Sequence, residues 1–251
     1  MYKNSRGQSE LFGFLLIFAV VILTIALVTA TGFVGFNSAQ DYQRTTNAEG
    51  AFTVLASNID DVSQMGAPSR ATEIRIADAS LSHEKEDSGI DIALDGEALN
   101  LAESGETGSI VYDSGTDTTI TYRSGALIRE DGGSSLLFRE PEFVITDEEV
   151  ILPMVRLSPG GTSEVGGTSN VDVRTINGGT DVVAESKPVD DNVTIALETP
   201  HVDAWKRYFE QFEGDGPITK VSPDFDENTV EVEIETDRLS VTVDRITTTF
   251  R

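Results

Sequence analysis

Apolar residues follow three different patterns along the chain, and the first is an uninterrupted run. Leu11–Phe36 is almost wholly apolar and carries no charged side chain. As a helix it would span roughly 39 Å, more than the roughly 30 Å hydrocarbon core of a bilayer. This stretch therefore predicts a transmembrane helix rather than the core helix of a soluble domain.

The second pattern has the period of an amphipathic helix. Apolar residues recur at spacings of four and three, which places them on one helical face: Ala48, Phe52, Leu55, Ile59 and Val62. Gly66 followed by Pro68 predicts the end of this helix. We expect a long helix over residues 8–66, transmembrane at about 11–36, whose second part packs on a sheet. A short juxtamembrane coiled coil is the alternative.

The third pattern is strict alternation with a period of two, which is typical of strands with one buried face. It is clearest at Val230–Ile234 and Leu239–Val243, which predict a hairpin with Asp237 in its turn. A second hairpin is predicted around Asn177-Gly178-Gly179. Further strands are expected at these positions: Glu73–Ala77, Ile90–Leu94, Ser109–Tyr112, Thr118–Tyr122, Leu136–Arg139 and Val150–Leu157.

The predicted fold class is α+β, with a long N-terminal helix followed by a mainly antiparallel, β-rich domain over residues 67–251. One short helix is expected at His201–Phe212, between Pro200 and Gly214. Its aromatic residues favour a place in the core over a recognition surface. Ser158–Asn170 is rich in Gly and Ser and predicts a flexible loop.

Charge excludes one class of partner. The chain has 43 acidic and 18 basic residues, a net charge of −25. Nucleic-acid binding needs cationic surface, so DNA and RNA are not expected partners. Concentrated salt relieves the repulsion within such a surface, which is therefore typical of halophilic proteins, with an ordinary acidic secreted protein as the alternative. There is no cysteine, which excludes disulfides and thiolate sites.

The residues that flank the apolar run predict its orientation. Lys3 and Arg6 precede it and acidic sequence follows, so the N-terminus is expected in the cytoplasm and the β-rich domain outside the cell. Val28-Thr29-Ala30 could serve as a signal peptidase site, but the apolar stretch is longer than that of a secretory signal. An uncleaved signal anchor fits the length.

The junction Arg6-Gly7-Gln8-Ser9-Glu10, followed by the apolar run, resembles the class III signal peptides of archaeal type IV pilins and archaellins. The resemblance implies that residues 1–7 are a leader and that a prepilin peptidase cuts between Gly7 and Gln8. It also implies a role for Glu10 in docking subunits into a filament. In type IV pilins the docking Glu is fifth in the mature chain, whereas Glu10 would be third and Phe12 fifth.

A second resemblance extends over most of the chain. It is most evident in residues 67–79, which read APSRATEIRIADA. This part is similar to an uncharacterised haloarchaeal family of membrane-anchored proteins with pilin-like N-termini. That resemblance implies a place at the cell surface and brings no activity with it.

Candidate chemical sites are few. His83 is expected in a solvated turn and His201 in the first turn of the short helix, so neither a zinc site nor a histidine-based triad is predicted. The carboxylate cluster Asp224–Asn228 lacks the Gly and distal Glu of a calcium loop, which favours a solvated surface. Asn192-Val193-Thr194 makes Asn192 a candidate glycosylation acceptor. No cofactor and no metal are expected.

Three functions follow from these patterns. The first is a pilin-like or pseudopilin-like structural protein of the cell surface, whose partners are the lipid bilayer, further copies of the chain in an oligomer or filament, and a prepilin peptidase. The second is an uncleaved, signal-anchored ectodomain that acts as a non-enzymatic binding module. The third, an extracellular hydrolase that uses two carboxylates, is disfavoured because no particular pair stands out.

Overall fold

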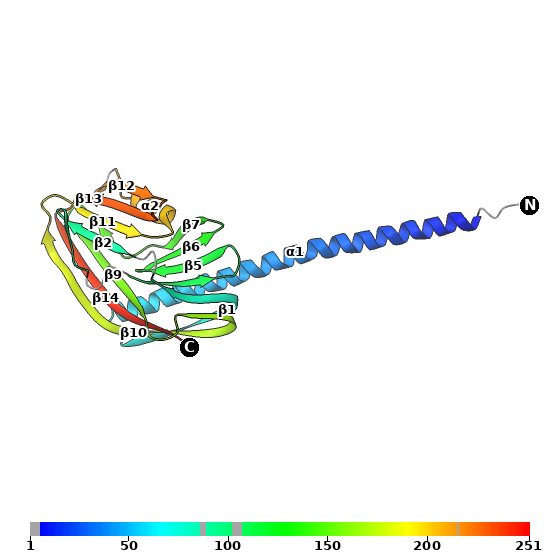
Figure 1. The fold of residues 1–251 in the computed structure, drawn as a ribbon, viewed down its shortest axis with the longest axis horizontal. Helices are drawn as coiled ribbons and strands as arrows, with labels where there is room; N and C mark the ends of the chain where they lie inside the picture. The colour runs from blue at the N-terminus through cyan, green and yellow to red at the C-terminus, as the bar shows by residue number, and fades with distance from the viewer. Residues whose placement is uncertain (1–5, 86–88, 102–106, 215) are drawn as a thin grey trace, which may run out of the picture. The chain divides into compact units, whose positions relative to one another are not determined.

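The computed structural model describes residues 6–85, 89–101, 107–214 and 216–251, with the side chains of residues 6–11 and 30–38 left aside (Figure 1). Contacts within the chain divide it into two units. One comprises residues 1–46 and the other residues 47–251. Each unit is described by itself.

The described residues form two α-helices and fourteen β-strands. The helices are α1 (Arg6–Ser63) and α2 (Val202–Glu210). The strands are β1 (Ser69–Glu84), β2 (Ile90–Leu94), β3 (Glu97–Ala98), β4 (Ser109–Asp113), β5 (Thr118–Arg123), β6 (Ala126–Asp131), β7 (Ser134–Arg139), β8 (Val144–Ile145), β9 (Val150–Pro159), β10 (Glu164–Pro188), β11 (Val193–Glu198), β12 (Ile218–Asp224), β13 (Thr229–Ile234) and β14 (Arg238–Phe250).

The strands build two sheets. The larger has nine strands in the order β7-β6-β5-β4-β1-β10-β14-β9-β8, and the smaller has five in the order β12-β13-β11-β2-β3. Pairing is antiparallel except between β9 and β14, which run parallel. The prediction of an N-terminal helix followed by a β-rich, mainly antiparallel domain with one short helix is therefore confirmed.

Two hydrophobic clusters hold the domain together. In the first, the five-stranded sheet and α2 pack with β6, β9 and β14 of the larger sheet. In the second, the C-terminal part of α1 packs on the nine-stranded sheet. Strands β6, β9, β10 and β14 contribute to both clusters, because successive side chains of a strand point to opposite faces of the sheet.

The C-terminal part of α1 confirms the amphipathic pattern. Its five periodic apolar residues are at most 2% exposed and belong to the second cluster: Ala48, Phe52, Leu55, Ile59 and Val62. Burial of a large apolar side chain contributes roughly 1.5–3 kcal/mol. The helix ends at Ser63, shortly before Gly66, which adopts the left-handed conformation (φ 69°).

The predicted hairpin around Asp237 is wrong, although both of its strands exist. β13 lies between β12 and β11 in the smaller sheet, whereas β14 lies between β10 and β9 in the larger one. Period-2 alternation identifies a strand with one buried face but not the neighbour that its edges pair with. Residues 235–237 therefore connect two sheets.

The hairpin predicted at Asn177-Gly178-Gly179 is also wrong, because β10 continues through these residues. The pairing of β10 with β14 shifts register between Asn177 and Thr180, as in a β-bulge. A Cβ atom on Gly178 would lie 2.8 Å from the carbonyl oxygen of Arg245. Glycine is needed here because two backbones approach each other closely. From the sequence alone, this requirement cannot be distinguished from that of a turn.

The flexible loop predicted at Ser158–Asn170 is mostly strand. β9 extends to Pro159, and β10 begins at Glu164 and pairs with β1 from there onward. The glycines of this stretch accompany an irregularity of the pairing, since the register shifts between Ala77 and Ala79, and Gly167, opposite Ala79, has a φ of 118°.

The short helix is confirmed as α2. Three of its aromatic residues, Trp205, Tyr208 and Phe209, are buried in the first cluster, and Phe212, just after the helix, packs against that cluster. Their rings contact one another, as in the stacked pair of Trp205 and Phe209 with centroids 5.9 Å apart. The prediction that these aromatics are core residues is therefore confirmed.

Candidate functional site

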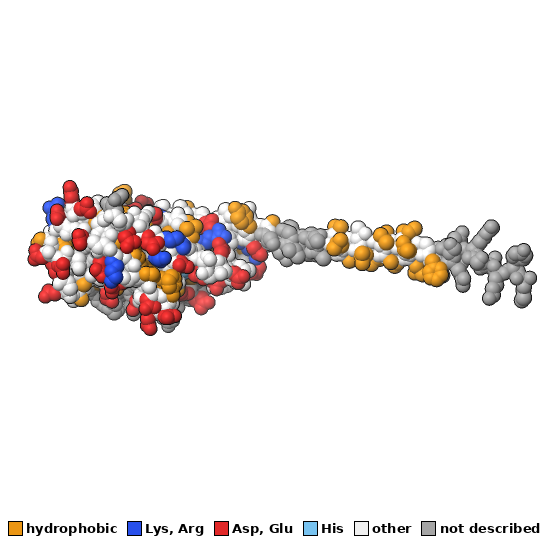
Figure 2. All heavy atoms as spheres, turned by 90° about the horizontal axis from the view of Figure 1, so that it is seen from above, with side chains coloured by type: hydrophobic (Ala, Val, Ile, Leu, Met, Phe, Trp, Pro, Cys, Tyr) orange, Lys and Arg blue, Asp and Glu red, His pale blue; other side chains and the backbone are white. Residues whose placement is uncertain are grey.

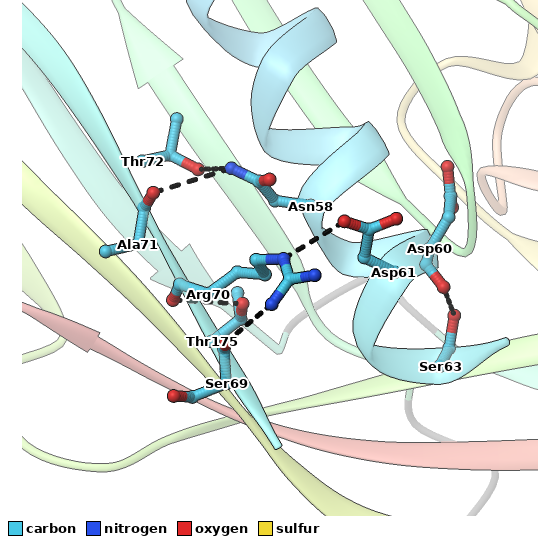
Figure 3. Close-up of polar contacts among 9 residues, drawn as sticks. All are labelled: Asn58, Asp60, Asp61, Ser63, Ser69, Arg70, Ala71, Thr72 and Thr175. Atoms are coloured by element: carbon cyan, nitrogen blue, oxygen red, sulfur yellow. Dashed lines mark hydrogen bonds and ion pairs between the residues drawn. The ribbon is translucent and has the colours of Figure 1, made fainter. Parts of the chain in front are cut away.

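Polar contacts fix the C-terminal part of α1 against β1 (Figure 3). Asn58 Nδ2 donates a hydrogen bond to Thr72 Oγ1 over 2.8 Å, and Arg70 Nε lies 3.0 Å from Asp61 Oδ2. On β10, Asn177 Nδ2 donates to the carbonyl oxygen of Val62 over 2.8 Å. These contacts set the rotation of the helix over the sheet as well as its position.

Two further ion pairs join the same part of α1 to β6 and β7 of the nine-stranded sheet. Arg129 of β6 contacts Glu49 over 2.7 Å, and Arg139 of β7 contacts Asp60. The second pair is the more enclosed, with side chains 24% and 19% exposed. Burial raises the pKa of Asp60, and Arg139 opposes this shift only in part.

The N-terminal part of α1 has the opposite character. Phe12–Thr29 is long and apolar enough to span a membrane, and none of this stretch is buried. Its large side chains, such as Leu23, are 48–72% exposed. In Figure 2 they form an apolar surface, whereas the visible face of the β-rich domain carries many acidic side chains. Apolar exposure on this scale marks a surface that another phase or another protein covers.

A polar cleft with a volume of about 390 Å³ opens on the β-rich domain. Its floor is the face of β1, β4 and β5 opposite the α1 contacts. Ser82, Val111 and Thr121 lie side by side across these strands because the register pairs them. The neighbouring residues Tyr112 and Tyr122 point the other way, into the second cluster.

The cleft is lined by hydroxyls and carboxylates. The hydroxyls come from Ser80, Ser82, Ser109, Thr119, Thr121 and Thr199. The carboxylates come from Glu84, Asp113, Glu130 and Glu164, and the remaining described lining residues are Val111, Arg123, Pro200 and His201. Among these described residues, the imidazole of His201 is the only aromatic ring.

His201 forms the inner wall of the cleft. Its ring is buried, with Nε2 3.3 Å from Thr121 Oγ1 and Nδ1 3.0 Å from Glu130 Oε2. The second contact lacks the alignment of a hydrogen bond. Burial lowers the pKa of His201 more than the Glu130 carboxylate raises it, so the imidazole is neutral at pH 7.

Arg123 lies at the bottom of the cleft and is only 2% exposed. Its guanidinium donates to the carbonyl oxygens of Gly89 and Glu198, with the Gly89 bond at 2.9 Å, and Nε donates to Thr107 Oγ1 over 3.4 Å. A buried guanidinium is tolerated when its donors are satisfied. Arg123 therefore ties the segment before α2 to β5 and builds the inner end of the cleft.

The structure corrects the prediction for His83. This residue belongs to β1 rather than to a solvated turn, and it is only 8% exposed. Burial is the largest influence on its imidazole and lowers its pKa. His201 is the N-cap residue of α2, next to the predicted position in the first turn.

The other predicted site residues lie apart from the cleft. Gly7, Gln8 and Glu10 are in the first turns of α1, and their side chains lie outside the described residues. Asn192 is half-buried in the connection between β10 and β11. Asp224 ends β12, and its Oδ1 accepts hydrogen bonds from the backbone N–H groups of Asp226 and Glu227. This carboxylate of the cluster therefore stabilises the turn that follows β12.

The sequence carries a signal for the cleft, although not in the form of a motif. Ser80, Ser82 and Glu84 alternate with buried residues, and so do Thr119, Thr121 and Arg123. Alternating polar residues are typical of any strand with one solvated face, so this pattern does not by itself indicate a cleft. Within the described ranges no group of three or more His, Asp or Glu residues is placed to hold a metal ion.

Comparison with known proteins gives one match. A model of a family of unknown function, DUF7289, matches residues 6–249. Neither the curated proteins nor the solved structures contain a match. The matched span includes the apolar part of α1, its packed part and all but the last two residues of the β-rich domain.

Proposed function

The chain belongs to the DUF7289 family, and since the function of that family is unknown, we propose one from the residues: a pilin-like or pseudopilin-like structural protein of the cell surface. In this proposal α1 anchors the chain in the membrane through Phe12–Thr29 and can exchange lipid contacts for contacts with helices of other copies. The β-rich domain lies outside the cell.

One observation carries the proposal. A single helix combines a fully exposed apolar stretch, Phe12–Thr29, with a second stretch, Ala48–Val62, that is a built-in part of the domain core. A simple tether needs no rigid attachment to the domain that it anchors. In a pilin-like subunit, by contrast, one helix supplies both the membrane-bound segment and a part of the domain core, and the two stretches of α1 suit these two roles.

The charges support the proposed orientation. Lys3 and Arg6 precede the apolar stretch, and cytoplasmic flanks are enriched in such residues. The acidic domain, in a chain of net charge −25, suits concentrated salt outside the cell, where screening relieves its self-repulsion.

Mass spectrometry of the mature N-terminus tests this function. Prepilin-type processing predicts Gln8 as the first residue, and Gly7→Val should leave the leader uncut. Ser9→Ala, next to the junction, is the matched control and should be processed as the unchanged chain is. A mature chain that begins at Met1 or at Thr31 would contradict the proposal.

The polar cleft favours a second candidate, a signal-anchored ectodomain that acts as a binding module. It differs from the first in assembly rather than in anchoring. Shearing of intact cells separates the two: a pilin-like subunit is released in sedimentable filaments, whereas an anchored ectodomain stays with the membrane as single copies.

A further inference from the structure

We propose that the polar cleft binds a small organic cation that carries two or more ammonium groups. This inference concerns the β-rich domain alone and stands whether or not the chain assembles into filaments. Its basis is the size of the cleft, the sign and spacing of its charges, and the chemistry of its inner wall.

The size of the cleft fits a small molecule. Its volume of about 390 Å³ is within the roughly 300–1,000 Å³ range of ligand sites. Most such sites are lined by apolar side chains, whereas among the described lining residues here only Val111 and Pro200 are apolar. A polar lining of this kind selects a polar ligand.

Charge excludes an anion. The described lining has four carboxylates and one guanidinium, and Arg123 directs its hydrogen bonds to Gly89, Glu198 and Thr107. The ligand therefore meets acceptors: the carboxylates and the hydroxyl oxygens. Ammonium groups supply three donors each and no acceptor, which matches such a lining.

The spacing of the carboxylates argues for an extended cation rather than a metal ion. Glu84, Asp113, Glu130 and Glu164 come from β1, β4, β6 and β10, and within the described residues no three of them converge as metal ligands. A diamine or triamine spreads its charges over several ångströms and can meet separate carboxylates. A neutral sugar is less suited, because the described lining offers no Phe, Tyr or Trp ring on which to stack.

The inner wall supplies the specific contact. Glu130 is held beside the buried His201 ring, whose Nδ1 lies 3.0 Å from Glu130 Oε2, and Thr121 borders the same ring. His201 is only 6% exposed, so the wall is preformed. An ammonium group can donate to the Glu130 carboxylate, while Glu84, Asp113 and Glu164 on the exposed rim receive the second charge.

Isothermal titration of the full chain in detergent micelles with spermidine, at low ionic strength, tests the proposal. We expect binding at one site, weakened about tenfold by Glu130→Gln, because a hydrogen bond to a charged group is lost. Glu148→Gln is the matched control, since it removes the same charge from an exposed position outside the cleft and should change nothing. Glu164→Gln, on the exposed rim, should weaken binding about threefold with no risk to the core.

Four results would overturn the proposal. These are no spermidine binding, equal weakening by Glu148→Gln and Glu130→Gln, displacement of spermidine by equimolar Mg²⁺, or tighter binding of maltotriose than of spermidine. Equal weakening would show attraction to the net charge of the chain. Circular dichroism melting of Glu130→Gln checks folding, and Glu164→Gln decides the matter if Glu130→Gln is unfolded.

Discussion

The two parts of α1 have similarly apolar side chains and opposite surroundings. In Phe12–Thr29 apolar residues occupy every side of the helix and all are exposed, whereas in Ala48–Val62 they occupy one face and are buried by the nine-stranded sheet. A helix that is apolar on every side needs an apolar environment all around it. An amphipathic helix needs only one apolar surface to pack against. The distribution of apolar residues, not their number, separates the two roles.

The largest expected effect concerns the apolar part. Val20→Arg with Leu23→Arg should abolish membrane association, because each arginine near the centre of a transmembrane helix costs about 3 kcal/mol. Sedimentation of membranes after carbonate extraction measures this. Val54→Arg, on the exposed face of the packed part, is the control and should leave the chain in the membrane fraction. Retention of the double variant would show that Phe12–Thr29 is not the anchor.

The packed part should instead respond to the loss of volume. Leu55 is fully buried, so Leu55→Ala should lower the free energy of unfolding of the domain by about 2–5 kcal/mol. Val54→Ala, one residue away and 54% exposed, should cost less than about 1 kcal/mol. Denaturant unfolding followed by the fluorescence of Trp205, the one tryptophan of the chain, measures both. Equal effects would mean that the helix is not part of the core.

Among the ion pairs of the packed part, loss of a more enclosed pair should lower the free energy of unfolding more than loss of an exposed one. Arg139→Met leaves the Asp60 carboxylate half-enclosed without its cation and should destabilise the domain by about 1–2 kcal/mol, with partial recovery on adding Asp60→Asn. Arg70→Met breaks a pair whose side chains are 42% and 44% exposed and should cost at most about 1 kcal/mol. Chemical denaturation of these variants and the unchanged chain measures the order, and the reverse order would contradict it.

The smallest expected effect is that of pH, which should change the stability of the β-rich domain and not the membrane association of the apolar part of α1. The pKa values of His83 and His201 are lowered by burial, so below about pH 6.5 the unfolded chain binds more protons than the folded one. The free energy of unfolding should therefore fall as pH drops from about 6.5 and level off below the folded-state pKa values. Each imidazole can contribute at most about 1.4 kcal/mol per pH unit to this slope. Membrane association should not change over this range.

Thermal melting between pH 5 and pH 8 measures this dependence. His201→Gln removes one of the two buried imidazoles and should make the pH profile shallower. A profile that is unchanged in this variant would contradict the role of His201. Asp60 and Asp244 cannot supply the loss of stability at low pH, because burial raises their pKa values and their protonation stabilises the folded state, which is the opposite sign.

Elements of the fold could be predicted where local periodicity decides them. The spacing from Ala48 to Val62 identified the packed face of α1, and alternation identified β13 at Val230–Ile234. Pairing could not be predicted, because it depends on which edge each strand meets. β13 and β14 are adjacent in sequence but lie in different sheets, and Gly178 continues a strand where its neighbours in the sequence favour a turn.

The cleft could not be predicted for a related reason. Thr121, Glu130 and His201 are individually unremarkable, and His201 is 80 residues from Thr121 along the chain. Only the packing of α2 on the larger sheet brings them together. The acidic residues around them follow no spacing that separates this cluster from others in a chain with 43 acids.

The position of β14 has a consequence for biosynthesis. Among the described strands it alone links β7-β6-β5-β4-β1-β10 to β9-β8, so without residues 238–250 the nine-stranded sheet remains two separate pieces. Most of the domain thus emerges from the ribosome before this linking strand is made. Folding during synthesis cannot be completed strand by strand, and the chain has to stay unaggregated until the final insertion.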